Sequence, residues 1–256
     1  MHSLRDLREQ IIRAACAAGE GHIPSALSIL DILWVLYREI LSYDPNQPSD
    51  PERDRFVLSK GHASLGIYAI LAERGFFPIE ELKTFGRFSG RLGGHPDSLK
   101  VPGIEASTGS LGHGMPMAVG MALGLKIRES SPRVVCIVGD GECNEGTVWE
   151  AALLAAHHKL DNLTCIVDFN RSGDRALTLG DLPEKFRSFG WDVVEIDGHD
   201  HAQIKSSMTQ YSGSSPRVVI ANTIKGKGCS EMENNPAWHH KAPSLPELNR
   251  ILEQLT

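Results

Sequence analysis

The sequence predicts an α/β fold in which a mostly parallel sheet carries helices on both faces. Apolar stretches rich in β-branched residues are typical of buried parallel strands, and they occur near residues 134–138, 163–168, 193–196 and 218–223. Helix-forming segments separate these stretches, which favours a sheet covered on both sides. We expect residues 1–256 to form a single domain, because no linker, repeat or low-complexity tract divides the chain.

Apolar residues at helical spacing predict the helices around this sheet. They indicate helices over residues 4–18, 26–40, 63–74, 115–128 and 245–254, with another over 147–156. Gly120 and Gly124 are four residues apart, so the helix over 115–128 has a flat face that permits close approach of another helix.

Two stretches have the character of long loops. Residues 89–114 are rich in Gly, Ser, Pro and His, and residues 226–246 form a second such segment. Long loops in compact domains are usually functional. We therefore expect both to contribute to a site.

Composition narrows the class of protein. The net charge of −6 argues against nucleic acid or an acidic membrane surface as partner. No apolar run approaches the roughly 20 residues of a membrane span, so the expected location is the cytoplasm. The 5 cysteines form no CxxC pair, which is typical of reduced thiols in a reducing compartment.

The most informative motif is Gly139-Asp140-Gly141. It lies between the apolar stretch 134–138 and the helix 147–156, and Asn170 follows the next strand. The segment is one βαβ unit, so the two strands are expected to be parallel neighbours. Asp140 and Asn170 then converge at the edge where open α/β sheets bind ligands.

The residue types at this edge suggest a metal-bridged diphosphate. The glycines allow close approach to an anion, but the carboxylate of Asp140 would repel a phosphate unless a divalent cation lay between them. Carboxylate and amide oxygens suit Mg²⁺. No Gly-Lys-Ser/Thr follows, which excludes a Walker A loop, and Gly146 falls too late for Gly-x-Gly-x-x-Gly. A plain tight turn is the alternative for the glycines alone, and the coupling to Asn170 favours the metal–diphosphate interpretation.

With this motif the chain resembles the thiamine-diphosphate enzymes, and transketolases in particular. The resemblance covers residues 21–243, in transketolase order, and corresponds to the N-terminal, diphosphate-binding (PP) domain only. It most resembles the N-terminal subunit of a split transketolase. The segments that carry it are Gly21-His22, Asp54-Arg55-Phe56-Val57-Leu58-Ser59-Lys60-Gly61-His62, Gly93-Gly94-His95-Pro96-Asp97, Ser107-Thr108-Gly109-Ser110-Leu111-Gly112-His113-Gly114, Phe189-Gly190-Trp191, Ile196-Asp197-Gly198-His199-Asp200 and Thr223-Ile224-Lys225-Gly226-Lys227-Gly228.

The resemblance implies thiamine diphosphate and Mg²⁺ as cofactors, with Ca²⁺ or Mn²⁺ as substitutes for the metal. Its implied metal ligands are Asp140, Asn170 and the backbone carbonyl of Ser172. Asp168 could be a further ligand or could only cap the strand end. The implied cofactor contacts are His62, Gly109, Ser110, Leu111, Gly139, Asp140, Gly141, Glu142, Asn170 and His239.

The expected catalytic residues are four histidines and one glutamate: His22, His62, His95, His239 and Glu145. Imidazole in a loop can hydrogen-bond phosphate or sugar hydroxyls and transfer protons near neutral pH. The resemblance implies that His62 contacts the diphosphate, that His22 and His95 face the substrate, and that His239 lies near the reacting carbon. It places Glu145 in a carboxylate network across a dimer interface, whereas charge alone would make it a residue favoured by a helix dipole.

Other residues carry weaker expectations. His199 and His201 are expected at the surface. Pro24, Ser172 and His240 depart from the family pattern, since relatives usually have glycine, an apolar residue and glycine there. Together these departures suggest an unusual substrate.

The resemblance implies a subunit that moves a two-carbon ketol group from a ketose phosphate to an aldehyde. It implies a partner, a C-terminal transketolase subunit that supplies the pyrimidine-binding domain and its catalytic glutamate, in an α2β2 heterotetramer. Two alternatives stay open: a decarboxylative synthase that joins pyruvate to an aldehyde, and a non-catalytic regulatory homologue.

Overall fold

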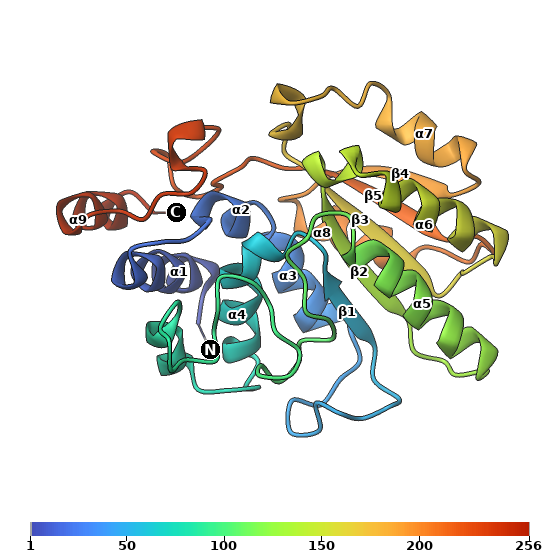
Figure 1. Ribbon diagram of the computed structural model, residues 1–256, viewed down its shortest axis with the longest axis horizontal. Coiled ribbons are helices and arrows are strands. Elements are labelled where there is room, and N and C mark those ends of the chain that lie inside the picture. The colour runs from blue at the N-terminus through green and yellow to red at the C-terminus, as the bar shows by residue number, and fades with distance from the viewer. Residues whose placement is uncertain (1, 256) are drawn as a thin grey trace.

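The computed structural model describes residues 2–255 and confirms the predicted α/β class (Figure 1). Its five-stranded sheet has the order β1-β2-β3-β5-β4, and every neighbouring pair is parallel. All the carboxyl ends therefore lie along one edge. The strands are β1 (Arg55–Leu58), β2 (Val134–Gly139), β3 (Leu163–Phe169), β4 (Asp192–Asp197) and β5 (Arg217–Asn222).

Strand β1 was not predicted from the sequence. The other strands lie within one residue of their expected bounds, but the run Arg-Phe-Val-Leu is only 4 residues long. A run of that length shows too little periodicity to be distinguished from a loop. Pairing with β2, from Arg55 opposite Val134 to Leu58 opposite Ile137, stabilises it as a strand.

Helices cover both faces of the sheet (Figure 1). One face carries α5 (Gly114–Ile127), α6 (Gly146–His157) and α7 (Leu182–Ser188). On the other side lie α2 (Ile23–Ser28), α3 (Leu30–Val35), α4 (Ser64–Glu73) and α8 (His201–Thr209). Beyond them α1 (Leu4–Ala18) packs on α2 and α4, and α9 (Leu245–Glu253) packs on α1. None of the described helices is both long and apolar enough to cross a membrane.

Two hydrophobic cores lie on opposite faces of the sheet, and the strands supply both. Along β2, Val135 and Ile137 pack with α1–α4, while Val134 and Cys136 pack with α5–α7. This alternation explains why β2 is apolar at nearly every position, as expected for a strand buried on both faces. Cys136 lies beside Cys165 in register, and both thiols are free and buried.

The helix predicted over residues 26–40 is wrong as a single element. It begins three residues earlier as α2, breaks at Ile29, continues as α3 and ends in a π-helical turn, Leu36–Ile40. Pro24 lies in the first turn of α2, where its missing N–H costs nothing. At the break, the Ser28 hydroxyl donates to the carboxylate of Asp168 2.7 Å away, a contact that periodicity cannot show.

The two predicted loops reach the carboxyl edge of the sheet. Residues 89–113 contain no helix or strand, and residues 226–244 contain only the 3₁₀ turn Pro236–Trp238. His95 and Gly109 from the first loop and His239 from the second line the same cleft. The long loops thus supply site residues from both directions.

We expect Gly114→Ala to lower the free energy of unfolding by about 1–3 kcal/mol, because an added Cβ would overpack the start of α5. That Cβ would lie 2.5 Å from the Cα of Ser59, and backbone cannot rotate away. Urea unfolding would measure the change. Gly120→Ala is the matched control, since open space surrounds Gly120 in the same helix, and alanine there should add about 0.5–1 kcal/mol. Equal effects of the two substitutions would contradict this account.

Candidate functional site

A cleft of about 440 Å³ lies at the carboxyl edge of the sheet, and we name it the edge cleft. It collects every predicted site residue except Ser110 and Glu145, which lie outside it. Of the predicted residues, the cleft is lined by His22, His62, His95, Gly109, Leu111, Gly139, Asp140, Gly141, Glu142, Asn170, Ser172 and His239.

Asp140 presents an unused carboxylate oxygen. Its Oδ1 accepts hydrogen bonds from the Gly141 N–H at 2.6 Å and from the Ser172 hydroxyl at 3.4 Å. Its Oδ2 is buried and has no hydrogen-bond partner among residues 2–255. Burial and the nearby charge of Asp168 raise the pKa of Asp140. A buried oxygen without a donor fits a metal ligand whose cation would stabilise the ionised form.

Asn170 lies next to Asp140 through two interlocked loops. Its Oδ1 accepts the Ser172 N–H at 3.1 Å, and its Nδ2 donates to Asp168 Oδ2 at 2.8 Å. The loop after β3 touches the loop after β2 so closely that a Cβ on Gly173 would lie 2.8 Å from the Gly141 backbone. The contact requires glycine and keeps the two predicted metal ligands on adjoining backbone.

Asp168 is neither exposed as a ligand nor a simple strand cap. It is fully buried and forms an ion pair with Lys60, whose side chain is 2% exposed. Ser28 and Thr223 also donate to the carboxylate. Burial opposes ionisation, but Lys60 and these donors outweigh it and hold the pKa of Asp168 below its ordinary value. This role of Lys60 was not predicted from the sequence.

Glu142 and Glu145 have different surroundings. Glu142 is buried, and it accepts from the Gly112 N–H at 2.7 Å, the Gly139 N–H at 3.1 Å and the Ser59 hydroxyl. Its carboxylate therefore braces the Gly139–Gly141 turn from inside the protein, and burial raises its pKa. Glu145 is exposed at the N-cap of α6, and its side chain makes no capping hydrogen bond.

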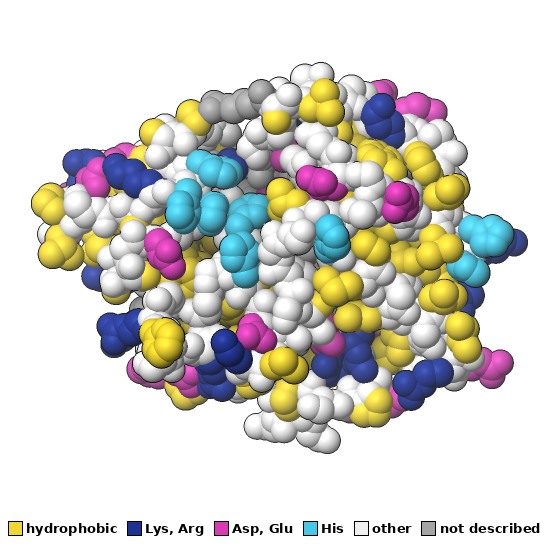
Figure 2. Space-filling model, viewed as in Figure 1, with side chains coloured by type: hydrophobic (Ala, Val, Ile, Leu, Met, Phe, Trp, Pro, Cys, Tyr) yellow, Lys and Arg dark blue, Asp and Glu magenta, His cyan; other side chains and the backbone are white. Residues whose placement is uncertain are grey.

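Histidine side chains gather over the edge cleft, on the face that Figure 2 shows. The His22 ring centroid lies 5.1 Å from His62, 5.4 Å from His239 and 4.4 Å from His240. Burial and then the neighbouring His240 lower the pKa of His22 to about 4. Burial and then Lys60 lower the pKa of His62 to about 2. Both rings are therefore neutral near pH 7, and each can donate and accept a hydrogen bond.

His95 lines the edge cleft from the first long loop. Tyr68 donates its hydroxyl to the His95 carbonyl at 2.9 Å, which fixes the segment to α4. A Cβ on Gly109 would lie 2.9 Å from the His95 ring. Gly109 thus makes room for the imidazole.

Besides Lys60, the polar residues Ser25, Asn144 and Lys225 line the edge cleft and were not predicted from the sequence. The Ser25 hydroxyl is buried and has no hydrogen-bond partner in the described part of the chain. Lys225 follows β5, and its Nζ lies 3.1 Å from His239 Nδ1. The strand-end rule that located Asn170 applies equally to Lys225, so this residue could have been found.

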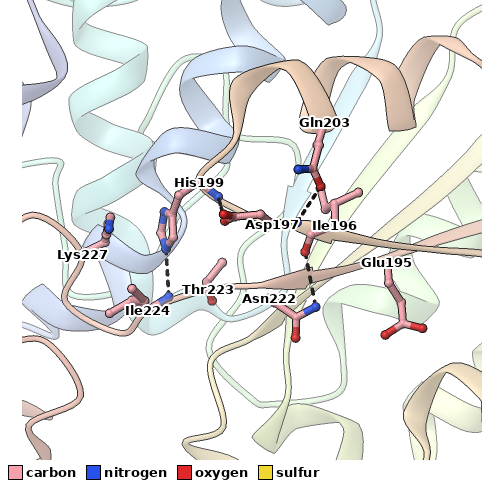
Figure 3. A pocket seen from close by; sticks show the side chains of 9 residues that line it. All are labelled: Glu195, Ile196, Asp197, His199, Gln203, Asn222, Thr223, Ile224 and Lys227. Atoms are coloured by element: carbon pink, nitrogen blue, oxygen red, sulfur yellow. Dashed lines mark hydrogen bonds between the residues drawn. The ribbon is translucent and has the colours of Figure 1, made fainter.

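A second hollow, of about 530 Å³, lies at the carboxyl ends of β4 and β5 (Figure 3). There His199 Nε2 accepts the Ile224 N–H at 2.8 Å, so Nδ1 carries the proton and donates to Asp31 at 3.0 Å. The side chain is 10% exposed, so its predicted surface position is wrong. His201 is half-exposed but also contacts Asp31 at 3.0 Å. His199 anchors the loop that carries Lys225.

The family model for the transketolase thiamine diphosphate binding domain matches residues 2–255. The chain belongs to this family. The match confirms the resemblance drawn from the motifs, and it covers the loops that build the edge cleft.

Individual relatives agree. The chain is 41% identical to a subunit of the apulose-4-phosphate transketolase of Actinobacillus succinogenes, over 97% of this chain and 92% of that one. It is 40% identical to the SqwG subunit of the 6-deoxy-6-sulfo-D-fructose transketolase of a Clostridium species, over 93% and 90%. Human transketolase is 38% identical over 97% of this chain, which spans only 41% of the human protein.

Solved structures show the same relation. A transketolase of Pichia stipitis, mutant R525L, superposes with a TM-score of 0.90 at 28% identity, covering 97% of this chain and 39% of that one. The chain therefore corresponds to nearly all of the relatives that are named as transketolase subunits and to less than half of the human and Pichia proteins.

The neutral His62 should make stability depend on pH. The pKa of His62 is lower in the folded protein than its value of 6.5 in the unfolded chain. Above pH 6.5 the residue is neutral in both states. As the pH falls from 6.5 toward 2, the unfolded chain takes up the proton first, which lowers the free energy of unfolding. Between pH 6.5 and 5.5 we expect this residue to remove about 1 kcal/mol of the free energy of unfolding. His62→Asn should flatten the dependence in urea titrations. An unchanged slope would show that His62 does not stay neutral in the fold.

Proposed function

We propose that this chain is the diphosphate-binding subunit of a two-chain transketolase. The observation that carries the proposal is the edge cleft, where a carboxylate oxygen without a hydrogen-bond partner among the described residues, an amide oxygen and neutral imidazoles converge. Together with a second chain, it would transfer a two-carbon ketol group from a ketose phosphate to an aldehyde. The split relatives of nearly equal length support this division.

Asp140, Asn170 and the backbone carbonyl of Ser172 would hold Mg²⁺. The buried Oδ2 of Asp140 is the observation that fits a cation, and oxygen donors of this kind suit Mg²⁺, with Mn²⁺ or Ca²⁺ as substitutes. The metal would join these ligands to the diphosphate of thiamine diphosphate. When bound, this cofactor supplies a nucleophilic carbon that attacks carbonyl groups.

The residues of the edge cleft around Asp140 and Asn170 would bind the diphosphate. Gly139 and Gly141 line the edge cleft without a side chain, so an anion could approach closely, although their N–H groups already donate to Glu142 and Asp140. His62 and His239 line the same cleft with uncharged rings. Lys225 adds a positive charge near His239, and the buried Ser25 hydroxyl could donate a hydrogen bond to the diphosphate. From the first long loop, Gly109, Ser110 and Leu111 would complete the cofactor contacts, and Glu142 would act through the turn that it braces.

His22 and His95 would face the substrate. Because burial keeps His22 neutral, its ring can accept a proton from a ketose hydroxyl or donate a hydrogen bond to a carbonyl without presenting a fixed positive charge. His239 would share this role near the reacting carbon. These residues bind, orient and move protons, while the bond-making carbon comes from the cofactor.

The partner would supply the pyrimidine-binding domain and its catalytic glutamate, in a cytoplasmic α2β2 assembly. The described chain presents surfaces that fit assembly. Leu153 and Leu154 of α6 are 59% and 46% exposed, and nothing lies within 4 Å of the Cβ position of Gly120 on α5. Isolated exposed leucines are ordinary, but these two lie on α6, which packs against α5, the helix that carries Gly120. Glu145 is exposed at the N-cap of α6, and its carboxylate would join the proposed network across the interface.

We infer that the donor is a ketose other than the ordinary pentose phosphates. The relatives of matching length bear the names of an apulose-4-phosphate and a 6-deoxy-6-sulfo-D-fructose enzyme. In this chain the exposed ring of His240 packs against His22, which lines the edge cleft. A donor of unusual shape or charge fits that difference.

The direct test is ketol transfer by the chain with and without the partner protein that co-purifies with it. With thiamine diphosphate and Mg²⁺, the pair should convert a ketose phosphate and an aldehyde, and the chain alone should not. Turnover by the chain alone would overturn the two-chain proposal. Release of carbon dioxide from pyruvate would favour a decarboxylative synthase instead, and bound cofactor without any turnover would favour a regulatory homologue.

Asp140→Asn should weaken Mg²⁺-dependent binding of thiamine diphosphate to the assembled enzyme by at least about tenfold, because it removes the charged ligand. Isothermal titration calorimetry would measure the affinity. Asp174→Asn is the matched control, since it removes an exposed carboxylate from the neighbouring loop and should leave the affinity within about twofold. Equal losses for the two variants would remove Asp140 from the metal site.

His240→Gly should relax donor selection. Removing the ring that packs on His22 leaves this cleft residue less constrained, and changes in pocket contacts of this size alter discrimination by about 10-fold or more. The measurement is the ratio of kcat/KM for the preferred donor to that for a pentose phosphate, which should fall toward one. An unchanged ratio would separate His240 from specificity.

A further inference from the structure

We propose that Asp168 is a positioning residue, which uses its carboxylate to fix the side-chain amide of Asn170 with the oxygen turned to the metal side. The role of this amide orientation in metal and diphosphate binding rests on the proposed function. The orientation itself is a property of the chain without any ligand. Asp168 does not touch the cation or the reacting atoms and acts through Asn170.

The carboxylate of Asp168 is a hub for donors from separate parts of the chain. Its Oδ2 accepts from Ser28 at the end of α2 at 2.7 Å, from Asn170 beyond β3 at 2.8 Å, and from Lys60 beyond β1. Its Oδ1 accepts from Thr223 beyond β5. Both oxygens are engaged and the residue is fully buried, so no lone pair is left exposed for a metal.

The hydrogen bond from Asn170 selects one of two amide orientations. The oxygen and nitrogen of an amide have nearly the same shape, so hydrogen bonds decide which points where. In the observed orientation, Nδ2 meets the carboxylate of Asp168, and Oδ1 meets the Ser172 N–H. The inverted amide would bring oxygen against carboxylate oxygen and N–H against N–H. Both contacts would be repulsive, and Asn170 would present donors where a cation needs an oxygen.

Lys60 makes the buried carboxylate of Asp168 stable. A carboxylate with no exposed surface is costly unless it is paired and fully hydrogen-bonded. Lys60 is almost as buried, and it also donates to the Ser25 carbonyl at 3.1 Å and approaches the Ser28 hydroxyl at 3.4 Å. A charged acceptor binds an amide more strongly than a neutral one, so the ion pair strengthens the selection at Asn170.

The alternative is that the hub only ties strand ends together. In that case, removing any one of its hydrogen bonds would lower stability and would change metal affinity only in proportion. Ser28 separates the two roles, because its hydroxyl donates to the same oxygen, Oδ2, but does not touch Asn170. Its side chain is fully buried.

The experiment compares Asp168→Asn with Ser28→Ala in two measurements. The first is NMR of the full chain without ligands, in which Asn170→Asp identifies the side-chain amide signal of Asn170. Wild type and Ser28→Ala should show an amide proton protected from exchange, and Asp168→Asn should lose that protection. The second is Mg²⁺-dependent binding of thiamine diphosphate to the assembled enzyme. Asp168→Asn should lose about 10- to 100-fold in affinity, and Ser28→Ala should stay within about twofold.

Each other outcome decides against one claim. If the Asn170 amide proton of the wild type exchanges without protection, the proposed orientation of this amide is wrong. If both variants lose the same affinity for thiamine diphosphate, the hydrogen bonds of Asp168 have only a structural role. A protected amide in a protein that never binds thiamine diphosphate would uphold the orientation and overturn the proposed function. If Asp168→Asn leaves Lys60 unpaired and does not fold, Lys60→Met combined with Asp168→Asn removes both charges and should show the same loss of protection and affinity.

Discussion

The carboxyl ends of β1, β3 and β5 meet at one buried charge, the carboxylate of Asp168, which is paired with Lys60. A buried ion pair is stable only when hydrogen bonds satisfy both charged groups. The donors to Asp168 come from α2, from the residue after β3 and from the start of the loop after β5, so the pair is stable only while these three segments keep their positions. Asn170 links the loop after β3 to this arrangement, because it donates to Asp168 and accepts the Ser172 N–H, and in that loop Gly173 lies against the Gly141 backbone. The predicted metal ligands Asp140 and Asn170 thereby share a buried support.

The electrostatics of the edge cleft favour a cation and an anion that bind together. Burial makes the ionised form of Asp140 costly and leaves one of its oxygens without a donor. Burial also keeps His22 and His62 uncharged. The cleft thus presents a carboxylate that favours a cation and rings that can donate hydrogen bonds to an anion. A metal–diphosphate unit answers both needs, whereas a phosphate alone would meet an unshielded carboxylate.

The sequence predicts the parts of this site that depend on local pattern, and it misses those that depend on contacts between distant residues. Continuous apolar runs located four strands to within one residue, and the strand-end rule brought Asp140 to Asn170. The short β1 is a strand only because β2 pairs with it. Lys60 and Asp168 are 108 residues apart, and no pattern in the sequence around either residue predicts that they pair. His199 was misplaced for the same reason, since Asp31 lies 168 residues away.

The central claim is that this chain builds one side of a site that a second chain completes. Native mass spectrometry of the complex purified from its own cells would test this most directly. We expect two copies of this chain with two copies of a pyrimidine-binding partner, and a mass increment for thiamine diphosphate and metal. Release of this chain as a lone homodimer, with neither partner nor cofactor under conditions that preserve other complexes, would contradict the claim.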